Sequence, residues 1–284
     1  MRIITVTAIA LILTAAVAAF VGFRPQVVQL PPRPAPSTPL RATIAIAPSD
    51  QALTFARYGE GAKEQTIVVT RYQNGVVTGV DLAPLLQPGE DAIAVYNRLG
   101  YNAIAAFVAG ARTSVNRDVE TLAVPVDLRS LHAAAATNYP EHADEAKVKD
   151  DPFIFAKVAQ PTSSRAAIPA SSGLLDYEVE LCVVIGKNAL YLKSPDDAPS
   201  HILGYTISQD VSERHWQVER SGQWVKGKSF PTFNPMGPWI ITADELKQKN
   251  LDPNNLALSC TIDGEVRQNS RTNDLIFGIN HCVW

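Results

Sequence analysis

Residues 174–186 constrain the fold of this chain more than any other stretch. A β-branched run closed by a glycine, residues 183–186, indicates a strand. Because side chains alternate along a strand, Asp176, Glu178 and Glu180 share one face. Three like charges leading into an apolar run repel one another, and burying them uncompensated is costly. Two interpretations remain open here: a bound hard cation such as Mg²⁺, Mn²⁺ or Ca²⁺, or an edge strand with its acidic face in water.

Length and composition limit the classes of protein to consider. A chain of 284 residues with 46% hydrophobic content can build one large domain or two small ones. The net charge is −3 and the basic residues are scattered, which argues against a nucleic-acid partner. The three cysteines are far apart, with no Cys-x-x-Cys pair and no disulfide framework.

The first 40 residues are unlike the rest. Residues 3–23 are apolar or small, long enough to span a bilayer and longer than the core of most cleaved signals. Residues 1–23 are therefore interpreted as a signal anchor or a signal peptide. Residues 24–40 contain six prolines and are expected to form an extended linker. Together they predict a membrane-anchored or secreted, extracytoplasmic protein, periplasmic if bacterial.

Residues 41–127 have the pattern of a small α/β subdomain. Residues 42–46 and 66–70 read as strands, and Asn74-Gly75 marks a hairpin turn. Residues 91–110 place apolar side chains at helical spacing. Because no reactive cluster occurs here, this part is interpreted as a packing or dimerisation subdomain.

Reactive residues concentrate after residue 131. His142 and Glu145 are three apart, so on a helix they can meet, and the carboxylate could orient the imidazole as a general base. A solvated pair on a helix surface is the alternative. Residues 204–210 read as a strand ending at Asp210, where a carboxylate could complete a metal site. Residues 234–239 read as a proline and glycine loop, and Asp263-Gly264 as a hairpin turn.

The order of these motifs resembles the fumarylacetoacetate hydrolase family, including its acylpyruvase and decarboxylase relatives, from residue 131 to residue 277. The matching motifs are Asn138-Tyr139 with His142 and Glu145; Phe155 and Lys157; residues 176–181; residues 184–187; residues 204–206; residues 210–212 with Arg214; residues 228–230; residues 237–239; and Gly264-Glu265 with Gln268.

This resemblance implies an α+β fold, a mixed β-roll or sandwich of the fumarylacetoacetate hydrolase type, with the small N-terminal α/β subdomain before it. It also implies Mg²⁺ or Mn²⁺ as cofactor, with Ca²⁺ as a further possibility. Asp176 does not match any of the family's metal-ligand positions. The implied metal ligands are Glu178, Glu180 and Asp210; the catalytic residues are His142 and Glu145, which activate water, and Lys228, which stabilises negative charge; the substrate-binding residues are Lys157, Arg214 and Gln217.

The activity implied is that of a divalent-metal-dependent hydrolase or C–C bond lyase acting on a small 2-oxo or 1,3-diketo acid, in a homodimer. One departure concerns the end of the chain. The family continues for several strands beyond Phe277, whereas residues 281–284 have no counterpart, so residues 131–284 are expected to form a truncated catalytic domain. Low stability and weak activity are therefore expected. The alternative is a catalytically impaired or incomplete member, a tethered binding protein or an unstable truncated product.

Overall fold

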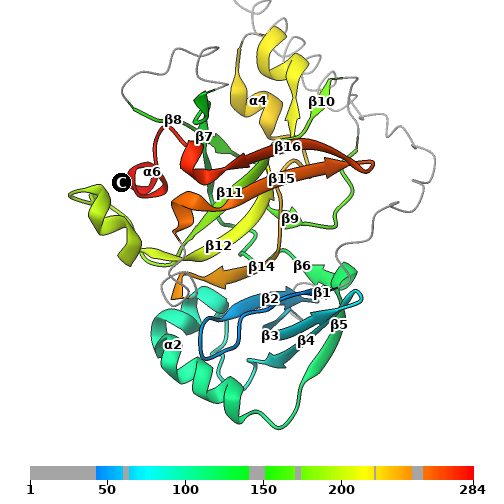
Figure 1. Ribbon diagram of the computed structural model, residues 1–284, viewed down its shortest axis with the longest axis vertical. Helices are drawn as coiled ribbons and strands as arrows, with labels where there is room; N and C mark the ends of the chain where they lie inside the picture. Colours follow the sequence, from blue (N-terminus) through cyan, green and yellow to red (C-terminus); the bar gives the residue numbers. More distant parts are fainter. Residues whose placement is uncertain (1–42, 60–63, 141–150, 170–173, 221, 245–251) are drawn as a thin grey trace, which may run out of the picture. The chain divides into compact units, whose positions relative to one another are not determined.

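The structure is a computed structural model that describes residues 43–59, 64–140, 151–169, 174–220, 222–244 and 252–284. Strands predominate and helices are few, which confirms the expected α+β class. The main sheet has the strand order β11-β12-β14-β2-β3-β4-β5 (Figure 1). Its strands are β2 (Thr54–Tyr58), β3 (Gln65–Gln73), β4 (Val76–Asp81), β5 (Val115–Asp118), β11 (Val179–Ile185), β12 (Ile202–Gln209) and β14 (Pro235–Thr242), with β1 (Thr43–Ile44), β6 (Leu122–Ala123) and β9 (Thr162–Ser163) attached beside this path.

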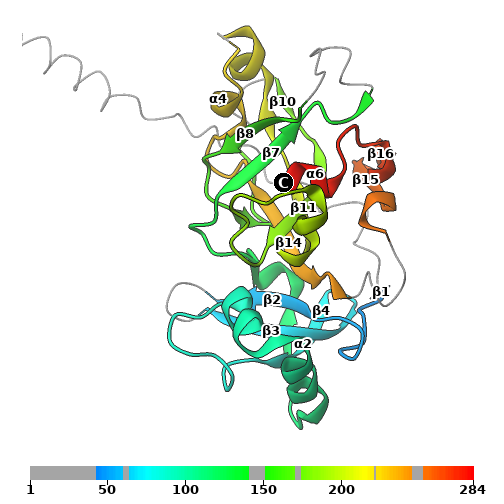
Figure 2. The ribbon, with the colours of Figure 1, turned by 90° about the vertical axis from the view of Figure 1, so that its left-hand side faces the viewer.

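The N-terminal part follows its local sequence signals. The hairpin of β3 and β4 turns at Asn74 and Gly75, whose φ angles of 50° and 81° suit a tight two-residue turn. Helix α2 (Ala92–Gly110) begins after Asp91, whose Oδ1 accepts a hydrogen bond from the backbone N–H of Ala94 at 2.8 Å. It lies along strands β2 to β4 (Figures 1 and 2), and its apolar face packs on Phe55 and other buried residues. The predicted turn and helix are both confirmed.

The main sheet joins the two regions that the sequence separates. β14 pairs with β2, placing Ile240 opposite Phe55. Trp239 of β14 also packs with Tyr72 of β3, with ring centroids 5.8 Å apart. Strands on both sides of residues 127–131 therefore share one sheet and one apolar core, while the domain boundary itself stays a prediction.

Pairing of β11 with β12 brings the acidic residues together. Val179 lies opposite Gln209 and Glu180 opposite Ser208. The backbone N–H of Asp210 then donates to the backbone carbonyl of Glu178 at 2.8 Å. Asp210 directly follows the end of β12, as the sequence predicted, so its carboxylate lies beside those of Glu178 and Glu180.

The loop expected at residues 234–239 is wrong, because residues 235–239 form the first part of β14. Pro235 is the first residue of the strand, where a missing N–H costs least. The pairing with β12 shifts register between Tyr205 and Ile207, opposite the part of β14 that contains Pro238. The prolines therefore occupy the positions of a strand that tolerate them.

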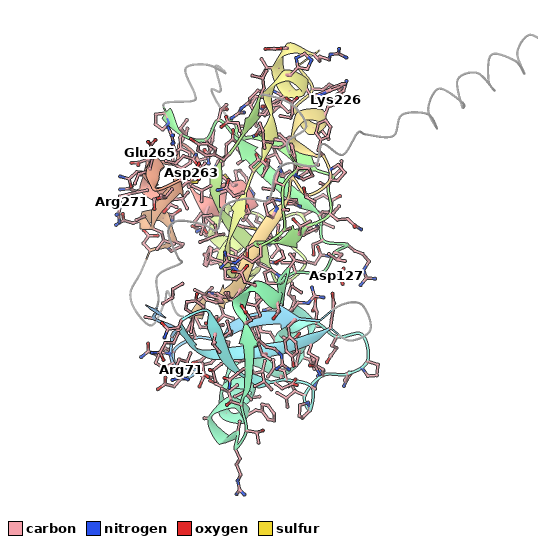
Figure 3. All side chains as sticks on the ribbon, turned by 90° about the vertical axis from the view of Figure 1, so that its right-hand side faces the viewer. Arg71, Asp127, Lys226, Asp263, Glu265 and Arg271 are labelled. Atoms are coloured by element: carbon pink, nitrogen blue, oxygen red, sulfur yellow. The ribbon has the colours of Figure 1, made fainter. Side chains whose placement is uncertain are left out.

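Three two-stranded sheets complete the described strands: β7 (His132–Ala136) with β8 (Phe153–Lys157), β10 (Leu175–Asp176) with β13 (Ser212–Glu213), and β15 (Ala257–Ile262) with β16 (Glu265–Arg271). The last pair turns at Asp263 and Gly264, which confirms that hairpin. Asp263, Glu265 and Arg271 lie on its exposed side (Figure 3).

Short helices connect these strands: η2 (Val119–Thr121), η3 (Pro195–Ser200), the π-helix η4 (His215–Glu219), α4 (Trp224–Lys228), η5 (Pro253–Asn255), η6 (Thr272–Asp274) and α6 (Ile279–Val283). Asn138 links the end of β7 to the segment before α6. Its side chain accepts from the backbone N–H of Phe277 at 2.8 Å and donates to the carbonyl of the same residue at 2.9 Å. The indole N–H of Trp284 donates to the carbonyl of Leu192 at 3.0 Å.

Candidate active site

Four carboxylates gather where β10, β11 and the end of β12 meet. Asp176 and Glu178 both accept hydrogen bonds from Arg214, at 2.6 Å and 2.5 Å respectively. Asp210 is almost completely buried, with a side chain 6% exposed, and the side chain of Glu178 is 21% exposed. Glu180 lies on β11, and the negative charges of Glu178 and Asp210 both raise the pKa of its carboxyl group. The single acidic strand face expected from the sequence is confirmed only in part. Asp176 lies on β10, in a different sheet from β11, and its side chain is 39% exposed, whereas Glu178 and Asp210 are largely turned away from water.

Two buried lysines neutralise part of this charge. The Lys228 ammonium group donates to Glu178 Oε2 at 2.5 Å and to Asp210 Oδ2 at 2.8 Å. Lys157 forms an ion pair with Asp210 Oδ1, and its side chain is fully buried. Burial alone would raise the pKa of Asp210, but the two ammonium groups outweigh burial and hold that pKa below its usual range. Asp210 is thus ionised and fixed between two cations.

Aromatic rings surround the Lys228 ammonium group. Its Nζ lies 5.3 Å from the centroid of Phe155 and 5.9 Å from that of Trp224. Ring faces attract cations, and their bulk limits the access of water. The Lys228 side chain therefore lies between two carboxylates and two aromatic rings.

Arg214 and Gln217 come from the turn that follows β13. Arg214 precedes the π-helix η4, a helix type found often at functional sites. Its Nη1 donates to Gln217 Oε1 at 2.7 Å while its other nitrogens bind Asp176 and Glu178. The two predicted substrate-binding side chains therefore lie in contact with each other and with the acidic group.

Close packing of α4 on η4 depends on a glycine. A Cβ added to Gly227 would lie 2.5 Å from the Cβ of Gln217 and 2.6 Å from its backbone nitrogen. No larger residue fits there without moving the backbone of η4 or α4. Gly227 therefore sets the position of Gln217 and of the adjacent Lys228.

Glu180 lacks the compensation that the other three carboxylates have. It accepts no hydrogen bond from any residue within the described ranges, whereas Asp176, Glu178 and Asp210 each contact a cation. Burial, followed by the negative charges of Glu178 and Asp210, raises the pKa of Glu180 from 4.5 to about 8. An ionised Glu180 therefore needs a further positive group beside it.

The donor set fits a hard divalent cation in its chemistry. Carboxylate oxygens are preferred ligands of Mg²⁺, Mn²⁺ and Ca²⁺, and Glu180 is a half-buried carboxylate that contacts no cation in the part of the chain that the structure describes. The present geometry is not that of a finished site, because no three His, Cys, Asp or Glu side chains in the described part of the chain could hold a metal ion as they stand. Lys228 lies between Glu178 and Asp210 instead. The assignment of Glu178, Glu180 and Asp210 as ligands thus stays a prediction.

These groups line a cavity of about 1980 Å³. Typical small-molecule sites occupy about 300–1,000 Å³, so only the part around the carboxylates could enclose a small acid. Its wall includes Glu178, Glu180, Asp210, Arg214, Gln217 and Lys228. Tyr139 also lines this cavity. Burial, and after it the negative charge of Glu180, raise the pKa of Tyr139 to about 12.

Seven of the nine predicted site residues are thus brought together or close to one another. His142 and Glu145 lie outside the described residues. The sequence reasoning missed His132 and Asn234, which form a hydrogen bond across 102 positions with no local signal. It also missed Trp224 and Gly227, although a glycine immediately before a reactive lysine could have suggested a close approach.

Comparison with known proteins identifies the family. The model of the fumarylacetoacetate (FAA) hydrolase C-terminal domain matches residues 132–283, more than half of the chain. The chain belongs to the fumarylacetoacetate hydrolase family. Membership confirms the resemblance drawn from the motifs, and it places the chain in a family of enzymes.

Relatives and solved structures agree with this membership. The mitochondrial oxaloacetate tautomerase FAHD2A of Bos taurus is 38% identical over 173 residues, which are 59% of this chain and 54% of the relative. This chain spans about half the length of the curated relatives it matches. The crystal structure of 5-carboxymethyl-2-hydroxymuconate delta-isomerase from Mycobacterium smegmatis is 26% identical, with a TM-score of 0.56 over 81% of this chain and 80% of the other. Maleylpyruvate hydrolase from Sphingobium sp. SYK-6, solved with manganese(II) ion and pyruvate, is 23% identical and shares the fold, with a TM-score of 0.60 over 81% of each chain.

The expected membrane-anchored or secreted, extracytoplasmic location is wrong. Related curated enzymes are named as mitochondrial. Helices long and apolar enough to cross a membrane are absent from the described residues. The predicted signal or anchor (residues 1–23) and linker (residues 24–40) lie outside those residues. The prediction rested on the length and hydropathy of residues 3–23, and these two properties alone do not identify a destination.

Proposed function

We propose that this chain is a divalent-metal-dependent enzyme that binds Mg²⁺ or Mn²⁺ through Glu178, Glu180 and Asp210 and acts on a small 2-oxo or 1,3-diketo acid. The observation that carries the proposal is Glu180, a half-buried carboxylate beside two other carboxylates that contacts no cation among the described residues. A hard divalent cation would relieve this repulsion. Family membership supports the same choice.

The protein side chains have separate proposed roles. When bound, the cation would polarise a carbonyl oxygen of the substrate. Lys228 carries a fixed positive charge beside the carboxylates, where it can stabilise negative charge that develops on an enolate oxygen. Arg214 and Gln217 hold each other in one orientation and can bind a substrate carboxylate. Lys157 keeps Asp210 in place.

His142 and Glu145 complete the proposal as the pair that moves protons or activates water. Two reaction types follow from how that pair is used. Interconversion of the enol and keto forms of a 2-oxo acid needs proton transfer between oxygen and carbon only. Hydrolysis of an acylpyruvate needs an activated water as well. Relatives named as oxaloacetate tautomerases make the first reaction the leading candidate, with oxaloacetate as the first substrate to test.

The homodimer implied by the family resemblance stays a prediction beside this proposal. It can be checked by sedimentation of the purified chain at several concentrations. A mass that stays at that of one chain would contradict it.

The decisive test compares metal uptake in two single-charge variants. Glu180→Gln keeps the shape of the side chain but removes its charge. Glu265→Gln makes the same change at an exposed carboxylate on the β15–β16 hairpin. In calorimetry of metal-free protein titrated with Mn²⁺, Glu180→Gln should weaken binding by at least about tenfold, whereas Glu265→Gln should bind like the unaltered chain.

Activity is measured on the same proteins. The unaltered chain with Mn²⁺ should speed the loss of the ultraviolet absorbance of enol oxaloacetate, and Glu180→Gln should not. Equal Mn²⁺ affinity in all three proteins would refute the metal assignment. Metal binding without turnover of oxaloacetate, but with cleavage of an acylpyruvate, would favour hydrolysis instead.

A further inference from the structure

His132 is a half-buried histidine at the start of β7 that none of the roles above uses. Its Nδ1 lies 2.7 Å from the side-chain oxygen of Asn234. The amide nitrogen of Asn234 donates to the carbonyl of Ala159 at 3.0 Å. The reverse amide orientation would set two oxygens against each other, so the oxygen of Asn234 must face His132.

This arrangement fixes the tautomer of His132. An amide oxygen only accepts hydrogen bonds, so Nδ1 of the ring must carry the proton. Asn234 is fully buried, and its backbone carbonyl also accepts from the N–H of Thr162 at 2.9 Å, which leaves the amide little freedom to turn. In the neutral ring the second nitrogen, Nε2, is then an acceptor with a free lone pair. No hydrogen-bond partner for Nε2 occurs among the residues that the structure describes.

His132 lies beside the acidic cluster. It is directly opposite Lys157 in the β7–β8 pair, so the two side chains share a face. The ammonium group of Lys157 reaches Asp210. His132 lines the same cavity as Glu178, Asp210 and Lys228.

Electrostatics keep this ring neutral. Burial lowers the pKa of His132, and the positive charge of Lys157 acts in the same direction. The hydrogen bond to Asn234 and the charge of Asp210 oppose them without reversing the shift. The charged acceptors that line this cavity are carboxylates, whose charge repels an anionic substrate. A neutral acceptor can bind a hydroxyl group of such a substrate without that repulsion.

We propose that His132 is a substrate-binding residue whose Nε2 accepts a hydrogen bond from the hydroxyl group of an enol or a 2-hydroxy acid. This inference rests on the proposed function, since it places the small acid at the same cluster. It adds a selectivity for the hydroxyl-bearing form of the acid over the form that lacks the hydroxyl. Asn234 acts through His132 as a positioning residue.

Two variants separate this role from a merely structural one. The amide of Asn can replace Nδ1 and keep the bond to Asn234, so His132→Asn removes only the cavity-facing acceptor. The longer Gln can replace Nε2 but not Nδ1, so His132→Gln keeps an acceptor near the cavity and loses the bond to Asn234. A binding role predicts that His132→Asn is the more damaging variant in ligand assays. A structural role predicts the reverse order.

The first measurement is turnover of enol oxaloacetate with Mn²⁺. His132→Asn should raise KM about tenfold, as expected for one lost hydrogen bond, with a much smaller change in kcat, while His132→Gln should stay within about threefold of the unaltered chain. The opposite ranking, or equal KM values in the three proteins, would overturn the proposal.

The second measurement does not need turnover. Calorimetry with Mg²⁺ present compares L-malate with succinate, which lacks the hydroxyl group. The unaltered chain should prefer L-malate, and His132→Asn should reduce that preference about tenfold while His132→Gln retains most of it. A preference that is absent, or unchanged in His132→Asn, would contradict the role of His132. If the chain fails to turn over oxaloacetate but shows this pattern, the proposed reaction is wrong and the binding role of His132 stands.

Discussion

The substitution Glu180→Gln should stabilise the metal-free protein, and increasingly so as the pH rises. Burial and the charges of Glu178 and Asp210 raise the pKa of Glu180 from 4.5 to about 8. A raised pKa means that the folded state holds a proton that the unfolded chain has already released. The stability contributed by that proton is complete below about pH 4.5 and is lost as the pH rises to about 8.

The size of the effect follows from the difference between the two pKa values. One pKa unit corresponds to about 1.4 kcal/mol, so the full difference from 4.5 to about 8 amounts to about 5 kcal/mol. At pH 7 about 3 kcal/mol of it has been lost. Gln resembles the protonated Glu in shape and charge and does not titrate. The variant should therefore match the unaltered chain near pH 4.5 and exceed its free energy of unfolding by about 3 kcal/mol at pH 7.

Urea unfolding of chelator-treated protein between about pH 5 and about pH 8.5 measures this difference. Glu265→Gln is the matched control, because Glu265 is exposed and its ion pair with Arg267 contributes little. Its free energy of unfolding should follow that of the unaltered chain at every pH. Adding Mn²⁺ should stabilise the unaltered chain more than Glu180→Gln. A constant difference between Glu180→Gln and the unaltered chain across the pH range would refute the argument that Glu180 is buried beside uncompensated charge.

Two further predictions concern packing and catalysis. Gly227→Ala should lower the free energy of unfolding in urea by about 1–3 kcal/mol or more, because the added Cβ would lie 2.5 Å from the Cβ of Gln217. The control is Gly110→Ala, whose Cβ would meet nothing within 4 Å and which should change stability by no more than about 1 kcal/mol. Equal effects of the two substitutions would count against the steric argument. His142→Ala and Glu145→Ala should each lower kcat by about 100-fold or more, and the double variant should be little worse than either single one, whereas fully additive losses would indicate two independent roles.

Local patterns in the sequence were enough to predict the elements that carry the carboxylates. The apolar run in residues 174–186 predicted strand β11, although β10 is a separate strand in another sheet, and the end of the following strand predicted the place of Asp210. The helix after Asp91 and the turns at Asn74-Gly75 and Asp263-Gly264 also rest on signals a few residues long. Such signals suffice because backbone preference and capping act over one or two turns of chain.

Contacts between distant residues left no such signal. The proline and glycine content of residues 235–238 predicted a loop where the structure has β14. The pairing of β14 with β2 and β12 depends on residues far away in the chain. The sequence likewise could not assign Lys157 and Lys228 to Asp210, or Asn234 to His132. Each of these contacts depends on the packed sheet, which forms only once the whole core is assembled.

The sequence left two interpretations of residues 174–186 open, a bound cation or an edge strand with its acidic face in water, and the structure agrees with one part of the second. β11 does lie at the end of the main sheet, as the edge-strand interpretation required. The carboxylates gathered beside it are nevertheless turned toward cations more than toward water, since Lys157, Lys228 and Arg214 contact three of the four. One negative charge, that of Glu180, is left over when all four are ionised. A divalent cation would change this excess from −1 to +1, and the carboxylate of a small acid would then neutralise the site. The same charge balance explains why the cluster can be buried and why an anionic substrate suits it.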